Sequence, residues 1–325
     1  MAAITCEKLS KTYKALGKKP VHSLRSLDLV VEENEVFGFL GRNGAGKTTT
    51  IKLLTGLIYP SAGSAALFGM DTRRPEARLK VGYMPEQPYF YEYLSPRETL
   101  EFYGRLRGLD AEERAREWDR ISELLDLRII ADRRIRGFSK GMRQRVGFAV
   151  ALVGDPPLLI LDEPMSGLDP LGRRMIRELI LSQRAAGKTI FFSSHVLSDV
   201  EEISDRVGIL VEGRLAACDR VAALVGNTPK SVELCVADLP PDAAAAMKAR
   251  AIECTELDAG RLRFVLPDAH TANALASDVF QAGGCLVSMH PVLESLEEFF
   301  TRIQDSAGIA VDSTETLAAV LAAEE

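Results

Sequence analysis

The stretch EVFGFLGRNGAGKTTTIKLLTGL, residues 35–57, joins an apolar strand pattern, a glycine-rich loop and a helical pattern. Its central part GRNGAGKT, Gly41 to Thr48, has the spacing GxxxxGK[ST] of a phosphate-binding loop, in the strand and helix context which that loop needs. Glycines let successive backbone N–H groups converge on phosphate oxygens, and the following helix start adds a favourable dipole. The stretch therefore predicts a nucleotide site at the end of a strand; a chance glycine-rich turn is the alternative.

The side chains of this loop predict ATP and Mg²⁺ as ligands. Lys47 would place a positive charge against the β- and γ-phosphates, and the hydroxyl of Thr48 would bind magnesium. The ATP-binding residues expected from this segment are Gly41, Asn43, Gly44, Ala45, Gly46, Lys47, Thr48 and Thr49.

A second stretch, LLILDEP at residues 158–164, ends an apolar strand in two carboxylates. Asp162 can hold the magnesium, directly or through water, and Glu163 can polarise the water that attacks the γ-phosphate. A surface turn with two solvated acids is the alternative, but it is less consistent with a phosphate-binding loop in the same chain.

The order of apolar runs predicts an α/β fold for residues 1–224. Strands are expected at EVFGFLG, KVGYMPE, LLILDEP, TIFFSSH and RVGILVEG, with EVFGFLG and LLILD apolar on both faces, as in central strands covered by helices. Between residues 88 and 145 the strand signal gives way to helical periodicity, which predicts an inserted helical subdomain.

The composition and the pattern of the sequence change after about Leu224. Residues 228–303 read as strand, helix, two strands, helix and strand, the βαββαβ order of a small α+β ferredoxin-like domain, here expected to have an accessory or regulatory role. ESLEEFFTRI is expected to form a closing helix, and the Ala- and Glu-rich residues 304–325 a tail.

Composition excludes several classes of protein. The 325 residues are 46% hydrophobic and 26% charged with a formal net charge of -6, which argues against a general affinity for nucleic acid. No apolar run reaches the roughly 18 to 20 residues that span a bilayer, and the first residues lack a secretion signal. The five cysteines have no CxxC spacing, so neither a disulfide framework nor a thiolate metal site is indicated, and a reducing cytosol fits.

The segment GFSKGMRQRVGFAVAL, residues 137–152, opens with a serine and several cations and then becomes apolar. Ser139 can cap the start of a helix, and a helix start with cations attracts an anion. The alternative is an ordinary amphipathic helix with solvated arginines.

Taken in order, GRNGAGKTT, Gln87 in GYMPEQ, FSKGMRQR, LLILDEP, SGLDP and SSH resemble the nucleotide-binding subunits of ABC transporters over roughly residues 3–217. KGMRQR resembles the exporter branch that works with ABC-2-type permeases for drugs, lipids or polysaccharides. The resemblance implies an ATPase that closes as a dimer with a second subunit, expected to be an identical chain. It also implies a separate integral membrane permease as partner, a peripheral place on the cytoplasmic side of the cell membrane, and no nucleic acid.

The resemblance implies roles for further residues. Ser139, Lys140 and Gly141 would act in trans, capping the γ-phosphate of ATP bound to the partner subunit; Phe138, Lys140 and Met142 depart from the family pattern LSGGQ. The remaining expectations are adenine stacking by Tyr13, a place for Gln87 in the magnesium shell, contact of His195 with the γ-phosphate, and a dimer contact by Asp169.

Two questions stay open at this point. The aromatic run PYFYEY, with Tyr89, Phe90, Tyr91 and Tyr93, fits either a groove for a permease helix or the core of the helical subdomain. The rival functions are a non-transport ABC ATPase that acts on ribosomes or nucleic acid, and a nucleotide-sensing regulatory module. A single cassette without sustained heptads argues against the first rival, and Asp162, Glu163 and His195 argue against the second.

Overall fold

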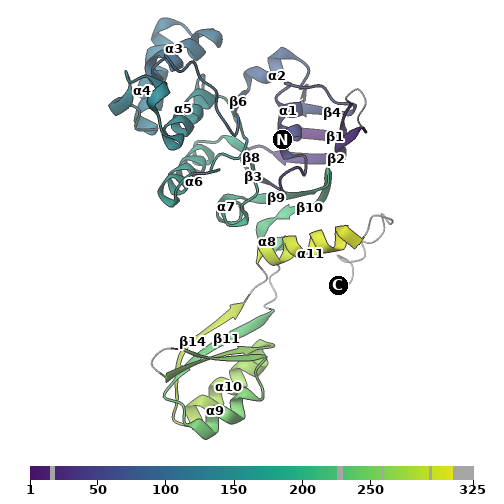
Figure 1. Ribbon diagram of the computed structural model, residues 1–325, viewed down its shortest axis with the longest axis vertical. Coiled ribbons are helices and arrows are strands. Elements are labelled where there is room, and N and C mark those ends of the chain that lie inside the picture. The colour runs from purple at the N-terminus through teal and green to yellow at the C-terminus, as the bar shows by residue number, and fades with distance from the viewer. Residues whose placement is uncertain (15–18, 225–229, 258–259, 293–294, 310–325) are drawn as a thin grey trace. The chain divides into compact units, whose positions relative to one another are not determined.

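The computed structural model describes residues 1–14, 19–224, 230–257, 260–292 and 295–309 (Figure 1). The chain separates into two compact units, Met1–Val221 with Ile303–Glu325, and Ala222–Arg302.

The first unit contains two sheets and a group of helices. Its strands are β1 (Ala2–Tyr13), β2 (Val21–Glu32), β3 (Val36–Leu40), β4 (Ala62–Leu67), β5 (Met70–Asp71), β6 (Val81–Met84), β7 (Leu158–Leu161), β8 (Thr189–Ser194), β9 (Arg206–Val211) and β10 (Arg214–Arg220). Its helices are α1 (Lys47–Leu54), α2 (Pro75–Leu79), α3 (Pro96–Leu106), α4 (Ala111–Leu124), α5 (Lys140–Leu152), α6 (Pro170–Ala185) and α7 (Leu197–Ile203), with short 3-10 turns at Arg128–Ile130 and Ile135–Gly137.

A six-stranded sheet in the order β10-β9-β3-β8-β7-β6 forms the centre of this unit. The five strands from β9 to β6 run parallel, and β10 pairs antiparallel with β9. All residues of β3 and β7 are buried, as their two-sided apolar pattern requires. The five strands predicted from sequence are therefore confirmed, and parallel pairing brings their carboxyl ends to one edge.

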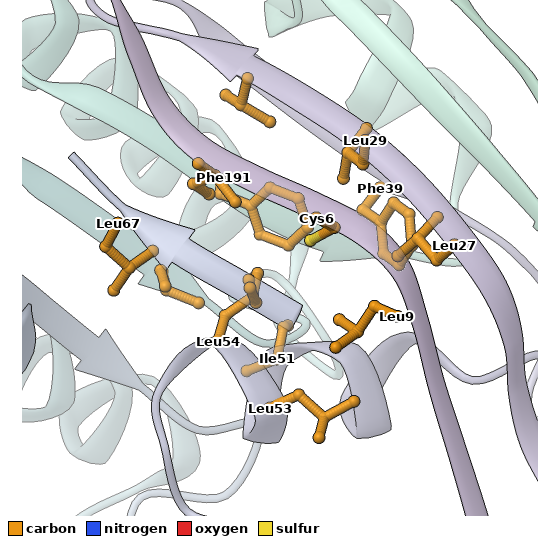
Figure 2. Close-up of a cluster of buried hydrophobic side chains, with 14 of the residues drawn as sticks. Cys6, Leu9, Leu27, Leu29, Phe39, Ile51, Leu53, Leu54, Leu67 and Phe191 are labelled. Carbon is orange, nitrogen blue, oxygen red and sulfur yellow. The ribbon is translucent and has the colours of Figure 1, made fainter. Parts of the chain in front are cut away.

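A second sheet, β2-β1-β4-β5, is antiparallel and covers α1. The two sheets and α1 enclose one apolar core, in which Leu9 and Leu27 face Phe39, Ile51 and Phe191 (Figure 2). The ring of Phe37 stacks on Phe191 and the ring of Phe39 packs against it at a tilt, with centroids 5.7 and 5.3 Å away. This core fixes α1, and hence the loop before it, against the central strand.

The helices between β6 and β7 begin with strong local signals. Ser95 caps α3 and Asp110 caps α4. In both helices the carboxylate of the glutamate three residues later accepts a hydrogen bond from the backbone N–H of the cap, which completes a capping box. Ser139 caps α5 by accepting a hydrogen bond from the backbone of Met142, so the predicted cap is confirmed. Helix α5 continues to Leu152 under β6, past the expected end of the insertion near residue 145.

The second unit is a four-stranded antiparallel sheet in the order β12-β13-β11-β14 with two helices. Along the chain its elements are α8 (Val221–Leu224), β11 (Ser231–Ala237), α9 (Pro241–Lys248), β12 (Glu253–Leu257), β13 (Arg261–Leu266), α10 (Ala269–Gln281) and β14 (Cys285–Val292). Alternate residues of β11 and β13 are buried against α9 and α10, including Val232, Leu234 and Phe264.

The last helix, α11, spans Leu296–Ile309 and so extends beyond residue 303, where the sequence reading ended it. Residues 310–325 of the expected tail lie outside the described residues.

Candidate functional site: a phosphate-binding loop facing a buried carboxylate

Four segments that follow parallel strands meet at one edge of the central sheet. The phosphate-binding loop follows β3, Asp162 and Glu163 follow β7, His195 follows β8, and Glu86 and Gln87 come shortly after β6. Because β3, β8, β7 and β6 are consecutive neighbours, these segments lie side by side at the carboxyl edge, the usual ligand position in open α/β sheets.

Backbone contacts shape the phosphate-binding loop. Gly46 has a φ of 112°, and a Cβ there would come within 2.4 Å of the carbonyl oxygen of Ser23 on β2. Only glycine fits this position. The side chain of Lys47 turns back over the loop, and its Nζ donates to the carbonyl oxygen of Gly41 at 2.6 Å. The loop therefore presents its N–H groups and one cation from a rigid frame.

The side chain of Glu163 lies between those of Lys47 and His195. Lys47 Nζ lies 3.2 Å from Glu163 Oε1, and His195 Nδ1 lies 2.8 Å from Glu163 Oε2. Lys47 and Glu163 are both buried, and His195 is 43% exposed. The backbone of Glu163 has a φ of 48°, which is rare for a residue with a side chain and is typical of functional positions. Glu163 is thus fixed between a cation and an imidazole.

Ser193 forms hydrogen bonds with both acidic residues, and sequence reasoning missed it. Its Oγ accepts from the backbone N–H of Glu163 at 2.9 Å and donates to Asp162 Oδ1 at 2.7 Å. Thr48 Oγ1 donates to the same oxygen at 3.4 Å. Burial raises the pKa of Asp162, and the hydrogen bonds from Ser193 and Thr48 oppose this. The signal was the SSH motif, from which only the histidine was selected.

These groups open into a pocket of about 500 Å³. The pocket is lined by Ser23, Arg42, Asn43, Gly44, Gly46, Lys47, Thr48, Thr49, Glu86, Glu163, Ser166 and His195. Ser23 was not predicted; its hydroxyl lies 2.8 Å from that of Thr49. Among the described residues, the lining does not include Tyr13, which is 41% exposed, or Gln87, whose neighbour Glu86 takes part instead.

The signature segment, defined as FSKGMRQR at residues 138–145, contributes nothing to this lining among the described residues. Ser139 and Lys140 are exposed at the start of α5. The Lys140 side chain lies over Gly167, where an added Cβ would come within 2.2 Å of Nζ. Asp169 caps α6 by accepting from the N–H of Gly172 at 2.8 Å. Within one chain, the predicted residues thus form two separate groups: those around the pocket, and the signature segment with Asp169.

The aromatic run after Gln87 contains both buried and exposed rings, so each of the two roles considered for it, core and binding surface, fits some of its members. Phe90 is buried in the helical region, whereas Tyr89, Tyr91 and Tyr93 are 89%, 50% and 66% exposed. Tyr91 packs edge-on against Phe102 of α3, with ring centroids 5.6 Å apart. One ring therefore belongs to the core and three lie on the surface.

Within the described ranges, none of the helices combines the length and apolar character needed to cross a bilayer. The described part of the chain also contains no group of three or more His, Cys, Asp or Glu side chains placed to hold a metal ion.

Comparison with known proteins agrees with this geometry. Residues 24–166 match the family model described as ABC transporter. An uncharacterised ABC transporter ATP-binding protein of Synechocystis is 45% identical over 224 residues, 67% of this chain and 63% of that protein. The match therefore spans less than two thirds of that relative.

One further relative matches more of this chain, and another matches less of it. YxlF of Bacillus subtilis, an uncharacterised ABC transporter ATP-binding protein, is 32% identical over 300 residues, 92% of this chain and 99% of its own. The bacitracin transport ATP-binding protein BcrA of Bacillus licheniformis is 42% identical over 196 residues, 59% of this chain and 63% of its own.

Among solved structures, an ATP-binding subunit of an ABC transporter superposes with a TM-score of 0.62 at 32% identity, covering 68% of this chain and 91% of that one. With the loop, Glu163 and His195 lining one pocket, these matches place the chain in the family of ABC transporter ATP-binding proteins.

Proposed function

We propose that this chain binds ATP with Mg²⁺, hydrolyses the bond to the γ-phosphate, and so powers transport through a separate membrane permease. The observation that carries the proposal is the placement of Glu163, held between Lys47 and His195 at the mouth of the phosphate-binding loop. A loop without such a carboxylate would support nucleotide binding alone.

Glu163 acts as the general base. It takes a proton from a water whose oxygen attacks the γ-phosphorus, the bond from that phosphorus to the bridging oxygen breaks, and ADP and phosphate leave. An arriving γ-phosphate competes with Glu163 for Lys47, which frees the carboxylate to face the water. His195 orients the water and contacts the γ-phosphate. Its hydrogen bond to Glu163 holds the imidazole and the carboxylate in a fixed position relative to each other.

The oxygen donors near the loop suit magnesium. The hydroxyl of Thr48 and the carboxylate of Asp162 lie 3.4 Å apart, and Mg²⁺ prefers one or two such oxygen ligands together with water and phosphate. When bound, the ion neutralises charge on the β- and γ-phosphate oxygens. Gln87 is exposed beside Glu86, and a place for it in this shell stays a proposal, as does adenine stacking by Tyr13.

The signature segment completes the site of a second copy of the chain. Ser139, Lys140 and Gly141 lie outside the described lining of the pocket in their own chain. Lys140 and Gly141 approach Gly167 and Leu168, which directly precede Asp169. Two copies in antiparallel arrangement would pair each loop with the partner's signature segment. The exposed Tyr89, Tyr91 and Tyr93 offer amphipathic rings for contact with the permease.

The exporter branch with ABC-2-type permeases is the finer assignment that we favour. The KGMRQR sequence and the similarity to a bacitracin transport ATP-binding protein support it. The subunit would then lie peripherally on the cytoplasmic side of the membrane. The order β12-β13-β11-β14 with two helices supports a ferredoxin-like accessory domain over residues 228–303. None of the relatives described above favours a ribosomal or nucleic-acid function.

The test is ATP turnover by the purified chain and by Glu163→Gln. The wild type should release ADP and phosphate, and Glu163→Gln should bind ATP nearly normally but turn it over about 10² to 10⁴ times more slowly, the range for loss of a general base. Turnover of the variant within about threefold of the wild type would remove Glu163 from this role.

A further inference from the structure

A buried carboxylate lies four residues after His195. Asp199, on α7, is 2% exposed, and its two oxygens each lie 3.4 Å from an arginine of α6: Oδ2 from Arg173 Nη1 and Oδ1 from Arg177 Nη1. Arg177 also pairs with Glu202 at 2.5 Å. A buried carboxylate is retained only when such partners compensate its desolvation, so this ion cluster holds α7 against α6.

The two helices lead directly to groups of the proposed site. Helix α6 starts at Pro170, after its cap Asp169, and α7 starts at Leu197, two residues after His195. Asp199 therefore connects the segment that carries His195 to the helix that begins beside the expected dimer contact.

Helix α7 needs such a connection. It has seven residues and no side-chain cap, and so short a helix has little stability of its own. Its later part is fixed on β3, where a Cβ on Gly38 would come within 2.6 Å of both Val200 and Ser204. Only a glycine at position 38 lets Val200 and Ser204 pack this close to β3. The earlier part, next to His195, is tied to α6 through Asp199.

We propose that Asp199 is a positioning residue for hydrolysis: held by Arg173 and Arg177, it fixes the start of α7 and thereby the place of His195 beside Glu163. The inference rests on the proposed ATPase function. His195 is 43% exposed and bonds Glu163 through one nitrogen, so its ring depends on its backbone for placement. A small displacement of a group that orients the water lowers the rate steeply without weakening nucleotide binding.

The experiment compares ATP turnover and ATP binding for the full chain with Asp199→Asn and Asp199→Glu. Asp199→Asn keeps the shape and removes the charge; its kcat should fall about tenfold with KM for ATP within about twofold. Asp199→Glu restores the charge and should recover part of the lost kcat. Equal kcat for the wild type and Asp199→Asn would overturn the proposal, as would a glutamate variant no better than the asparagine variant.

The matched control is Lys188→Met. Lys188 is also buried and paired, with Asp155 at 2.5 Å, and it precedes the same strand β8 whose other end leads to His195. This variant should lower the melting temperature but keep kcat within about twofold. A tenfold loss of kcat here would mean that any buried charge near β8 matters, and would overturn the specific role of Asp199.

Arg177→Gln covers the case in which Asp199→Asn does not fold. It removes one of the two cations and leaves Arg173, and it should lower kcat with unchanged KM; an unchanged kcat would overturn the proposal. A wild type without turnover would instead reject the proposed function. In that case, a measurement of ATP binding by Glu163→Gln would show whether the chain still binds the nucleotide.

Discussion

The phosphate-binding loop and the signature segment are both anion-attracting helix starts, but they have different surroundings. The loop faces Glu163 and His195 from neighbouring strands and forms one wall of a pocket. The signature segment places exposed Ser139 and Lys140 at the start of α5, outside that pocket. The first has its chemical partners within the chain, whereas the second lies outside the described pocket lining, and we propose that it meets the nucleotide of a second copy. This difference is what a site shared between two copies predicts.

Among the variants that test this comparison, the largest effect is expected from Gly141→Asp. Among the described residues, a Cβ at Gly141 would meet only Leu168, at 3.7 Å, and Gly141 lies in a helix, so the variant should fold. Its carboxylate would repel a phosphate of the partner's nucleotide, and turnover should fall at least about 10²-fold with ATP binding retained. Gly141→Ala, which adds no charge, is the control and should be less affected.

Mixing chains sharpens the comparison. Lys47→Ala loses its own loop but keeps a sound signature segment, so in a heterodimer with Gly141→Asp one composite site has both parts intact. Some turnover should return, measured against each variant alone. Because strict coupling of two sites can suppress recovery, dilution supplies the second measurement. Unchanged turnover per chain at concentrations where sedimentation detects only monomer would contradict the shared site.

Much of the pocket could be predicted because its chemistry is encoded in short contiguous motifs. The motifs place four of its residues just after predicted strands: Lys47, Thr48, Asp162 and Glu163. Parallel pairing of those strands then brings the residues to the same edge of the sheet. Ser193 was missed because its role depends on hydrogen bonds to residues about 30 positions away.

The antiparallel sheet was missed for a different reason. In β1 the pairing with β2 shifts register after Cys6 and again after Leu9, so buried residues do not alternate regularly. The period of two, on which a strand prediction depends, is therefore broken in a strand of 12 residues. In β11 and β13 the alternation is regular, and these strands were found without any motif.

Ser193→Ala should have an intermediate effect on turnover. It alters the pocket around the phosphate-binding loop and leaves the signature segment unchanged. Without the hydroxyl, the buried N–H of Glu163 loses its acceptor, at a cost of about 1–3 kcal/mol. We expect turnover to fall about tenfold, since this bond helps to hold Glu163 at a positive φ. Thr189→Val, at the other end of β8, removes a hydroxyl that accepts only from Asn34 among the bonds described, and should leave turnover nearly unchanged. Equal turnover for both variants would deny Ser193 a special role.

The smallest effect is expected from Lys140→Ala, within the signature segment. Lys140 lies over Gly167 of its own chain, and its ammonium reaches beyond the helix start that Ser139 caps. If it adds a diffuse attraction for the partner's phosphates, its removal should raise KM for ATP less than about threefold and leave kcat nearly unchanged. Because salt screens exposed charges, the difference from the wild type should shrink further as ionic strength rises. A loss as large as that of Gly141→Asp, or one insensitive to salt, would show instead that Lys140 makes a direct and necessary contact, and the signature segment would then depend on its side chains as well as its backbone.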